Sequence, residues 1–350
     1  MIYGVTGAFF VLRWRIVINL RRKKRVLRAV GIVMCAAVFF RTAAGMAAWR
    51  ETAGAGILKW VDFQVTAQAM RDALAYDVGS HGGENEIHWI DLLACLGARY
   101  GGDFSRYKKA HMDGIAARLR EGEPMEDIAA GMKYYDYYST AYEAVLGGLV
   151  GDYAVQDGVT GSGAPAFRRE YGLKAFSPVA RGWAFSHNAD FGASRAFGYR
   201  RRHLGHDMFG SVGTPVINVE TCVVEAMGWN RYGGWRIGMR RLDGRRYYYY
   251  AHLRSGHPYA AGLAEGQTVY AGEVIGYLGM TGYSDREDYN GMQRPHLHFG
   301  IQLIFDENSR SEIWIDPYEL VRFLGSHRSA AVSVGGGEFR RESLFYDSIE

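Results

Sequence analysis

Two short motifs place histidine and aspartate at spacings that suit a metal site. The first is His203-Leu-Gly-His-Asp207, and the second, much later in the chain, is His296-Leu-His298. Residues two apart in an extended strand point to the same face, so each motif presents its ligand side chains together. Neutral imidazole nitrogen and carboxylate oxygen are the ligands of a catalytic zinc that keeps a fourth position for water. The spacing therefore indicates a zinc-dependent hydrolase.

The residues inside the first motif favour a strand as its setting. Gly205 has no side chain, which leaves room for an ion between His203 and Asp207. On a helix, residues two apart diverge by about 200°, so a His-x-His pair could not share one metal there. His206 falls on the opposite face of a regular strand, which favours a surface histidine, or one that contacts the ligands from behind, over a metal ligand.

A further histidine, His252, follows a run of four tyrosines and an alanine. Alternation along a strand puts Tyr248, Tyr250 and His252 on one face. A zinc hydrolase needs a group that takes a proton from water and returns one to the leaving amine. No glutamate accompanies the first motif, as it would in a His-Glu-x-x-His helix. We therefore expect His252 and the spare histidine of the His-x-His pair to share that work.

The elements that must position these histidines lie in the second half of the chain, over residues 176–325. Valine, isoleucine and aromatic residues alternate there with polar ones, and Asp243-Gly244 is a hairpin signal. Such short strands with frequent turns predict an antiparallel β domain, closed by a short helix at residues 317–324. The predicted strands are residues 214–219, 221–229, 235–240, 246–252, 267–271, 273–280 and 296–305.

Residues 50–151 have helical periodicity instead. The tyrosines between residues 134 and 142 favour helix packing over a sugar-stacking surface. Residues 152–165 are rich in glycine, serine and alanine. Residues 152–175 are predicted to be a linker, and residues 326–350 a loose tail. Ile57, Trp60, Val61 and Val65 recur at helical spacing. The predicted helices are residues 57–76, 89–100, 107–119 and 125–150, the last one long or broken.

Residues 1–49 predict a targeting or anchoring segment. Eight cations precede residue 29, and the first acidic residue is Glu51. Residues 29–40 are then uncharged and apolar, which suits the core of a signal peptide better than a full span of about 20 residues. Continuing through Arg41 gives the alternative of a single-span anchor with its basic side in the cytoplasm. Both interpretations place the bulk of the protein outside the cytoplasm, and eight cations disfavour a buried helix of a soluble protein.

The charge distribution excludes a nucleic-acid-binding protein, and the cysteine count excludes a disulfide-rich scaffold. The net charge of +4 is carried by the leader, and the remainder is net negative. Basic residues are therefore not spread over a folded face, which excludes a nucleic-acid-binding protein. The three cysteines make no disulfide framework, and a bridge between Cys95 and Cys222 would have to join two predicted domains. The predicted fold class is α+β multidomain, with the leader, a helical domain and a C-terminal antiparallel β domain.

The motifs around the histidines occur in an order that a known family shares. They are Phe191-Gly192 with Arg195, His203-Leu-Gly-His-Asp207, Gly213-Thr-Pro-Val216, Tyr250-Ala-His-Leu253, Glu265-Gly-Gln-Thr-Val269, Ala271-Gly-Glu-Val-Ile-Gly276, Gly279-Met-Thr-Gly282 and His296-Leu-His-Phe299. Over residues 178–317 the chain resembles the lysostaphin-type (LytM-like) zinc endopeptidases, peptidase family M23. These enzymes cut peptide stems or cross-links of bacterial cell walls.

The resemblance implies a role for each residue. The Zn²⁺ ligands would be His203, Asp207 and His298. His252 and His296 would be the catalytic pair, one activating or orienting the water and the other stabilising the oxyanion. The implied fold is a small antiparallel β domain with a groove over its sheet. The implied partners are peptidoglycan stem or cross-link peptides, outside the membrane, for a protein that is either secreted or anchored by its N-terminal segment.

The chain departs from the family pattern in two places. Residues 283–295 are longer than the family's connection before His-Leu-His, and we expect them to form a groove wall that alters substrate choice. The helical region before Gly151 matches no motif of an activity, so its role is not assigned.

Two other function classes compete with the enzyme. A non-catalytic LytM-like module would bind the wall or partner proteins, for example as an amidase activator or envelope scaffold. Such members typically lose ligands, whereas all five metal and catalytic positions are present here. A glycosidase in the helical region would need an acid pair, and Glu84 and Glu86 fit a solvated turn better.

Overall fold

The computed structural model describes residues 58, 61–306 and 312–347. The predicted leader, residues 1–49, lies outside the described residues. From Ile57 onward the chain forms one compact unit. Across the described ranges, no helix has both the length and the apolar character needed to cross a membrane.

The first part of this unit is helical, as predicted. The segment predicted at residues 125–150 is broken into two helices. The first predicted helix begins only at Ala67, so the helical spacing before it does not form a helix over residues 61–66. Thr66 caps the first helix, because its side chain accepts a hydrogen bond from the Ala69 N–H. The helices are α2 (Ala67–Ser80), α3 (Trp89–Tyr100), the short 3₁₀ helix η1 (Phe104–Arg106), α4 (Lys109–Arg120), α5 (Met125–Ile128) and α6 (Tyr135–Leu146).

The tyrosine stripe packs α6 against α3. Tyr138 and Tyr142 are buried. A Cβ atom added at Gly97 would lie 2.9 Å from Tyr138 Cγ and 2.9 Å from Tyr142 Oη. Only glycine allows this approach of the two helices, so these tyrosines serve packing, whereas Tyr134 is exposed.

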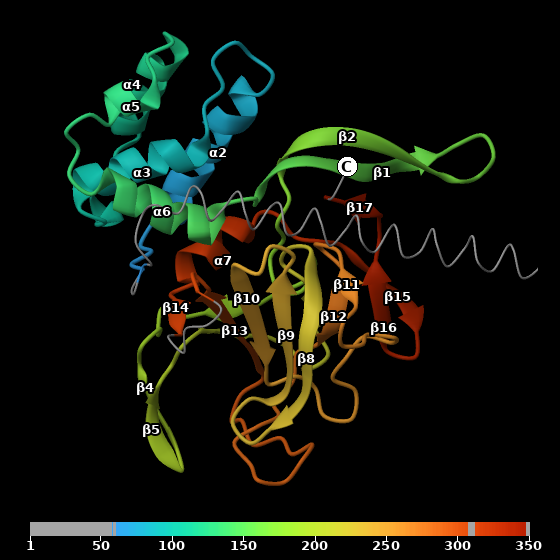
Figure 1. The fold of residues 1–350 in the computed structure, drawn as a ribbon. Coiled ribbons are helices and arrows are strands. Elements are labelled where there is room, and N and C mark those ends of the chain that lie inside the picture. The colour runs from blue at the N-terminus through green and yellow to red at the C-terminus, as the bar shows by residue number, and fades with distance from the viewer. Residues whose placement is uncertain (1–57, 59–60, 307–311, 348–350) are drawn as a thin grey trace, which may run out of the picture. The chain divides into compact units, whose positions relative to one another are not determined.

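The second part is built on a sheet of eight strands. Seven of them follow the order β11-β8-β9-β10-β13-β6-β3, and β14 pairs with β13. Figure 1 shows β8, β9 and β10 side by side. The predicted hairpin is confirmed between β9 and β10, where Gly244 takes a positive φ of 77°. The strands are β3 (Ser186–His187), β6 (His206–Phe209), β8 (Cys222–Asn230), β9 (Gly234–Arg241), β10 (Arg246–Ala251), β11 (Thr268–Val269), β13 (His296–Leu303) and β14 (Ile313–Ile315).

Smaller sheets surround the main one. The pair β7 (Pro215–Ile217) and β12 (Val274–Tyr277) lies where strands were predicted, whereas the hairpin of β4 (Ser194–Phe197) and β5 (Tyr199–Arg202) was not predicted. The closing helix is α7 (Tyr318–Leu324), close to its predicted bounds.

The segments expected to be a linker and a loose tail differ from that expectation. The linker range falls largely on a hairpin, and the tail holds three strands. Phe345 from the tail is buried against the rings of Tyr153 and Phe176, which supplies the apolar contact that holds these segments in place. The strands are β1 (Val150–Val159), β2 (Pro165–Leu173), β15 (Ala331–Gly335), β16 (Glu338–Arg341) and β17 (Phe345–Tyr346).

A buried ion pair joins the helices to the sheet. Arg246 Nε lies 2.8 Å from Glu220 Oε1. The same guanidinium donates to the carbonyl oxygens of Ala144 and Gly147 at the C-terminal end of α6. A cation there satisfies helix carbonyls that have no partner inside the helix. Cys95 and Cys222 are both buried and free.

Candidate metal centre and groove

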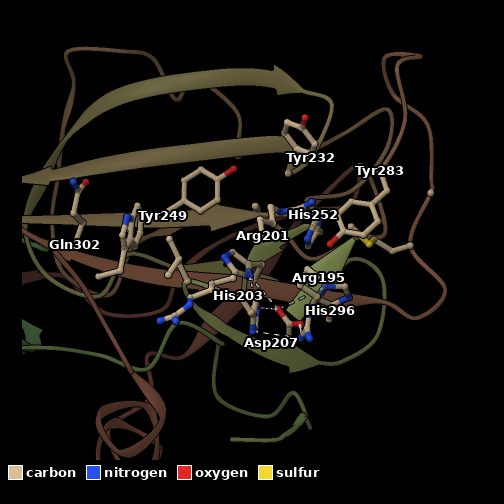
Figure 2. A pocket seen from close by; sticks show the side chains of 18 of the residues that line it. Arg195, Arg201, His203, Asp207, Tyr232, Tyr249, His252, Tyr283, His296 and Gln302 are labelled. Atoms are coloured by element: carbon tan, nitrogen blue, oxygen red, sulfur yellow. Dashed lines mark hydrogen bonds and ion pairs between the residues drawn. The ribbon is translucent and has the colours of Figure 1, made fainter. Parts of the chain in front are cut away.

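The two motifs meet across neighbouring antiparallel strands. His298 of β13 pairs directly with Asp207 of β6, and His296 pairs with Phe209. Directly opposed residues share a face of the sheet. Asp207, His296 and His298 therefore point to one side, as Figure 2 shows for the first two.

His203 reaches the same point from outside the strand. The sequence predicts an extended strand through the whole first motif, but β6 begins only at His206. His203 instead lies in the bent segment between β5 and β6. Its Nε2 atom is 3.0 Å from Asp207 Oδ1 and 3.0 Å from His298 Nδ1, and His298 Nδ1 is 3.0 Å from Asp207 Oδ1.

Gly205 is required for a reason other than the predicted one. A Cβ atom at this position would lie 2.5 Å from His298 Cε1 and 2.8 Å from the main-chain oxygen of Phe299. The space above Gly205 therefore holds the imidazole of His298 rather than an ion. The glycine admits the third ligand candidate to the cluster.

The three atoms fit a metal ion better than they fit one another. His203 Nδ1 faces the Asp190 carbonyl oxygen at 3.2 Å, so the neutral ring carries its proton there and turns a lone pair of Nε2 toward Asp207. Burial opposes the charged ring, but Asp207 and Asp190 raise the pKa of His203, so a proton occupies this point when no cation does. Two lone pairs at 3.0 Å repel each other unless a cation or a second proton lies between them. Edges of 3.0 Å are close to the roughly 3.3 Å that separates ligands of a tetrahedral ion with bonds of about 2.0 Å.

Asp207 stays ionised in this buried setting. Burial would raise its pKa, but the hydrogen bonds and charges of His203 and His298 hold the pKa of the carboxyl far below its ordinary value. Arg195 Nη2 contacts the second oxygen, Oδ2, at 3.2 Å and also pairs with Asp190. Arg195 therefore orients Asp207 so that Oδ1 faces the histidines.

His252 lies beside the cluster, but not by the route that alternation predicts. Tyr248 and Tyr250 are buried on the other face of β10, while Tyr249 and Ala251 line the groove. His252 follows the end of β10 with a positive φ of 61°, which turns its side chain toward the groove. The prediction that it shares a face with Tyr248 and Tyr250 is wrong for this reason.

The rings of His252 and His296 form a pair. Their centroids are 4.7 Å apart. His252 Nδ1 contacts the Thr281 carbonyl oxygen at 2.8 Å, and His296 Nδ1 contacts the Arg294 carbonyl oxygen at 2.8 Å. Both carbonyls fix the proton of a neutral ring on Nδ1 and leave Nε2 as an acceptor. Burial and the nearby His296 hold the pKa of His252 well below its ordinary value, so this ring is neutral at pH 7.

His206 lies behind the sheet. It pairs with Phe299, its Nε2 atom is 2.7 Å from His187 Nδ1, and its ring contacts that of Tyr318. Burial lowers its pKa to about 4. The structure separates it from the three clustered ligand candidates, as the sequence indicates, although it is buried rather than on the surface.

A groove of about 810 Å³ runs over the cluster. Figure 2 shows His203, Asp207, His252 and His296 around it. The long connection over residues 283–295 contributes to its wall, in agreement with the expectation for this segment. Its lining includes Arg195, Arg201, Tyr232, Tyr249, Tyr283, Met292, Arg294 and Trp314.

Sequence reasoning did not assign roles to two of the residues that position the site. Thr281 holds His252, and Arg195 holds Asp207. Both lie in motifs that the chain shares with the M23 family, and this position in the motifs could have identified them. By contrast, the turn near Glu84 and Glu86 is exposed, and the Glu86 carboxylate accepts from the Gly82 N–H at 2.6 Å. It forms no acid pair.

The region that contains the cluster is similar to known proteins. Residues 201–311 match the profile of peptidase family M23. The chain is 42% identical over 138 residues to an L-Ala–D-Glu endopeptidase of Bacillus subtilis, covering 39% of this chain and 40% of that protein. It is 33% identical over 124 residues to lysostaphin of Staphylococcus staphylolyticus, covering 35% of this chain and 22% of that protein. The chain thus spans less than half the length of these relatives.

A solved structure covers more of the chain. A candidate glycyl-glycine endopeptidase, lytM from Ruminococcus gnavus, is 20% identical, with a TM-score of 0.48 over 77% of this chain and 91% of that chain.

Proposed function

We propose that this protein is a zinc-dependent endopeptidase of bacterial peptidoglycan. The premise is that residues 201–311 form a peptidase M23 domain homologous to lysostaphin and to an L-Ala–D-Glu endopeptidase. The observation that carries the proposal is the triangle of His203 Nε2, Asp207 Oδ1 and His298 Nδ1 with 3.0 Å edges. The three residues are also the one set of histidine, cysteine and acidic groups in the described part of the chain that is arranged to hold a metal ion.

His203, Asp207 and His298 would hold the zinc. The ion would supply a water whose pKa is lowered to about 7 and would polarise the scissile carbonyl. A carboxylate and two neutral imidazoles leave a fourth position open, which is the ligand set of catalytic rather than structural zinc sites. Arg195 keeps Oδ2 of Asp207 engaged, so one oxygen is left for the ion.

His252 and His296 carry the proton transfers in this proposal. The neutral His252 ring accepts a proton at Nε2 and later returns it to the leaving amine. His296 would enter the reaction with a proton on both nitrogens, so that its Nε2–H donates a hydrogen bond to the developing oxyanion and no proton need pass to it from the water. The carbonyl oxygens of Thr281 and Arg294 hold both rings in orientation throughout.

The proposed place of action is outside the cytoplasm. The wall-acting relatives and the basic leader support this, and the leader would either be cleaved or serve as a membrane anchor. Peptidoglycan stem or cross-link peptides are the proposed partners.

The test uses the full chain on purified sacculi, with and without a chelator. We expect new amino groups that disappear with the chelator and return when zinc is added, and no new reducing ends. New reducing ends would indicate a glycosidase. Neither product from a zinc-loaded protein would contradict the proposal and favour the non-catalytic binding module.

A further inference from the structure

Arg201 lines the groove of the proposed metal centre and has no acidic partner among the residues that the structure describes. It belongs to β5 and pairs across the hairpin with Arg195. Its guanidinium carbon lies 4.8 Å from the centre of the Tyr232 ring and 4.9 Å from that of Tyr283. These aromatic contacts attract the guanidinium and restrict its rotation. Figure 2 draws Arg201, Tyr232 and Tyr283 together among the lining side chains.

The hydrogen-bonding capacity of Arg201 is not used within the described residues. Its Nη1 atom is buried and has no hydrogen-bond partner. A buried N–H without an acceptor lowers stability, and more so when the group is charged. A protein that keeps such a group oriented beside a groove can recover this cost when an acceptor binds.

The other charges of the groove favour an anionic ligand. Five arginines and three carboxylates line it: Arg195, Arg201, Arg202, Arg240 and Arg294 against Asp207, Glu225 and Glu312. The carboxylates have partners already. Asp207 contacts the histidines and Arg195, Glu225 pairs with Arg240, and Glu312 accepts from the Trp314 indole. None of the three is paired with Arg201.

Arg201 is also close to the proposed reaction centre. The Tyr283 ring that contacts its guanidinium lies 6.1 Å, centroid to centroid, from the His252 ring. An anion at Arg201 would therefore belong to the substrate peptide near the bond that is cut, rather than to a distant part of the wall. A planar guanidinium binds a carboxylate through two parallel hydrogen bonds.

We propose that Arg201 binds a free carboxylate of the substrate peptide next to the scissile bond, and so selects acidic peptides over amidated ones. This specificity role rests on the proposed function. It would make the amidation state of the wall peptide the property that this groove distinguishes.

The probes are two synthetic peptides, L-Ala–γ-D-Glu–L-Lys with a free α-carboxylate and its α-carboxamide counterpart. Both kcat/KM and the dissociation constant are measured with the zinc-loaded full chain. We expect the carboxylate peptide to be preferred about 10- to 100-fold, the size of a charge-assisted hydrogen bond. In Arg201→Gln the preference should fall to near one, mainly through KM. Arg201→Lys should keep part of it, because lysine retains the charge without the fork.

Arg231→Gln is the matched control. Arg231 also lies over aromatic rings, those of Phe197 and Tyr232, but it pairs with Asp285 and does not line the groove. Its replacement should leave the preference unchanged.

Equal binding of both peptides by the wild type, or a preference that survives in Arg201→Gln, would overturn the role of Arg201 while leaving the endopeptidase in place. Cleavage of neither peptide would count against the proposed function for this bond. The dissociation constants of wild type and Arg201→Gln would still decide the role of Arg201.

Discussion

Two buried carboxylates, Asp207 and Glu220, lie in opposite electrostatic situations. Both oxygens of Glu220 accept hydrogen bonds from within the protein. Arg246 binds both of them, and the Tyr248 hydroxyl donates to Oε1 at 2.7 Å. Asp207 Oδ1 faces one nitrogen of each of two imidazoles, His203 Nε2 and His298 Nδ1, and Arg195 contacts the other oxygen only. The first cluster is complete without a ligand, and the second is complete only with a cation or an extra proton.

The comparison distinguishes a structural from a functional charge cluster. Burial would raise the pKa of both carboxyls, and in both clusters the neighbours hold the pKa below its ordinary value. The lowered pKa alone therefore does not identify the site. The identity of the neighbours does, because an arginine and a tyrosine are donors at pH 7, whereas a histidine that gives up its proton presents a lone pair to a metal ion.

The largest expected effect is the loss of activity in two histidine variants, of which only one should also lose the metal. His203→Ala should lose both zinc and activity, the latter by about 10³-fold or more. His252→Ala should keep zinc and lose about 10²- to 10⁴-fold in kcat, because it removes only the proton acceptor. Zinc content by elemental analysis and turnover on sacculi give the two readouts. Full turnover of His252→Ala would remove His252 from the mechanism.

Removing Arg246 from the Glu220 cluster should lower the free energy of unfolding rather than the activity. Arg246→Ala leaves the buried Glu220 with one ion pair only, the longer contact of Arg241 Nε to Oε2 at 3.3 Å, and removes the donor to the carbonyls of Ala144 and Gly147. This should cost about 3 kcal/mol in the free energy of unfolding. Chemical denaturation of wild type and variant measures it. Arg118→Ala, which breaks the exposed pair with Glu123, is the control and should change little. A small effect for Arg246→Ala would mean that this cluster does not hold the helices to the sheet.

The histidine behind the sheet should make stability depend on pH. Burial lowers the pKa of His206 to about 4, below its unfolded value of 6.5. Between these values the unfolded chain binds more protons, so the contribution is complete above pH 6.5 and is lost as the pH falls toward 4. It amounts to about 3 kcal/mol at most. Denaturation of metal-free wild type and His206→Gln at pH 7 and 5 should show a weaker pH dependence in the variant, and parallel curves would contradict it.

A smaller effect is expected for Arg195, whose contact with Asp207 resembles that of Arg246 with Glu220. Arg195 is the one arginine on Asp207, so Arg195→Gln should keep the ligands but loosen their orientation. We expect zinc affinity to fall about 10- to 100-fold, as for other residues that hold metal ligands. Competition with a chelating dye measures the affinity. An unchanged affinity would mean that the histidines alone orient Asp207.

Periodicity predicted the elements well, and local backbone geometry limited the prediction of the site. The strands from β8 to β13 and the helices α3 and α4 follow apolar patterns within a few residues of their predicted bounds, whereas α2 begins ten residues after the start of its predicted segment. The face of His252 could not be predicted, because a positive φ at a histidine has no signal in alternation. The reason for Gly205 was also inaccessible, since the ring that fills its space comes from β13, far along the chain.

The tail and the hairpin of β1 and β2 were missed for a related reason. Their glycine and serine content suggests loops, and the contacts that order them are long-range. Phe345 reaches β1 and the segment before β7, and Tyr171 of β2 donates to Asp77 of α2. Neither contact leaves a local pattern.

Zinc titration of the metal-free protein tests the central contrast most directly. By calorimetry, wild type and His252→Ala should each bind one zinc ion per chain with similar affinity, and Asp207→Ala should bind none at the same concentrations. Zinc binding to Asp207→Ala with wild-type affinity and stoichiometry would contradict the assignment of this carboxylate as the metal ligand.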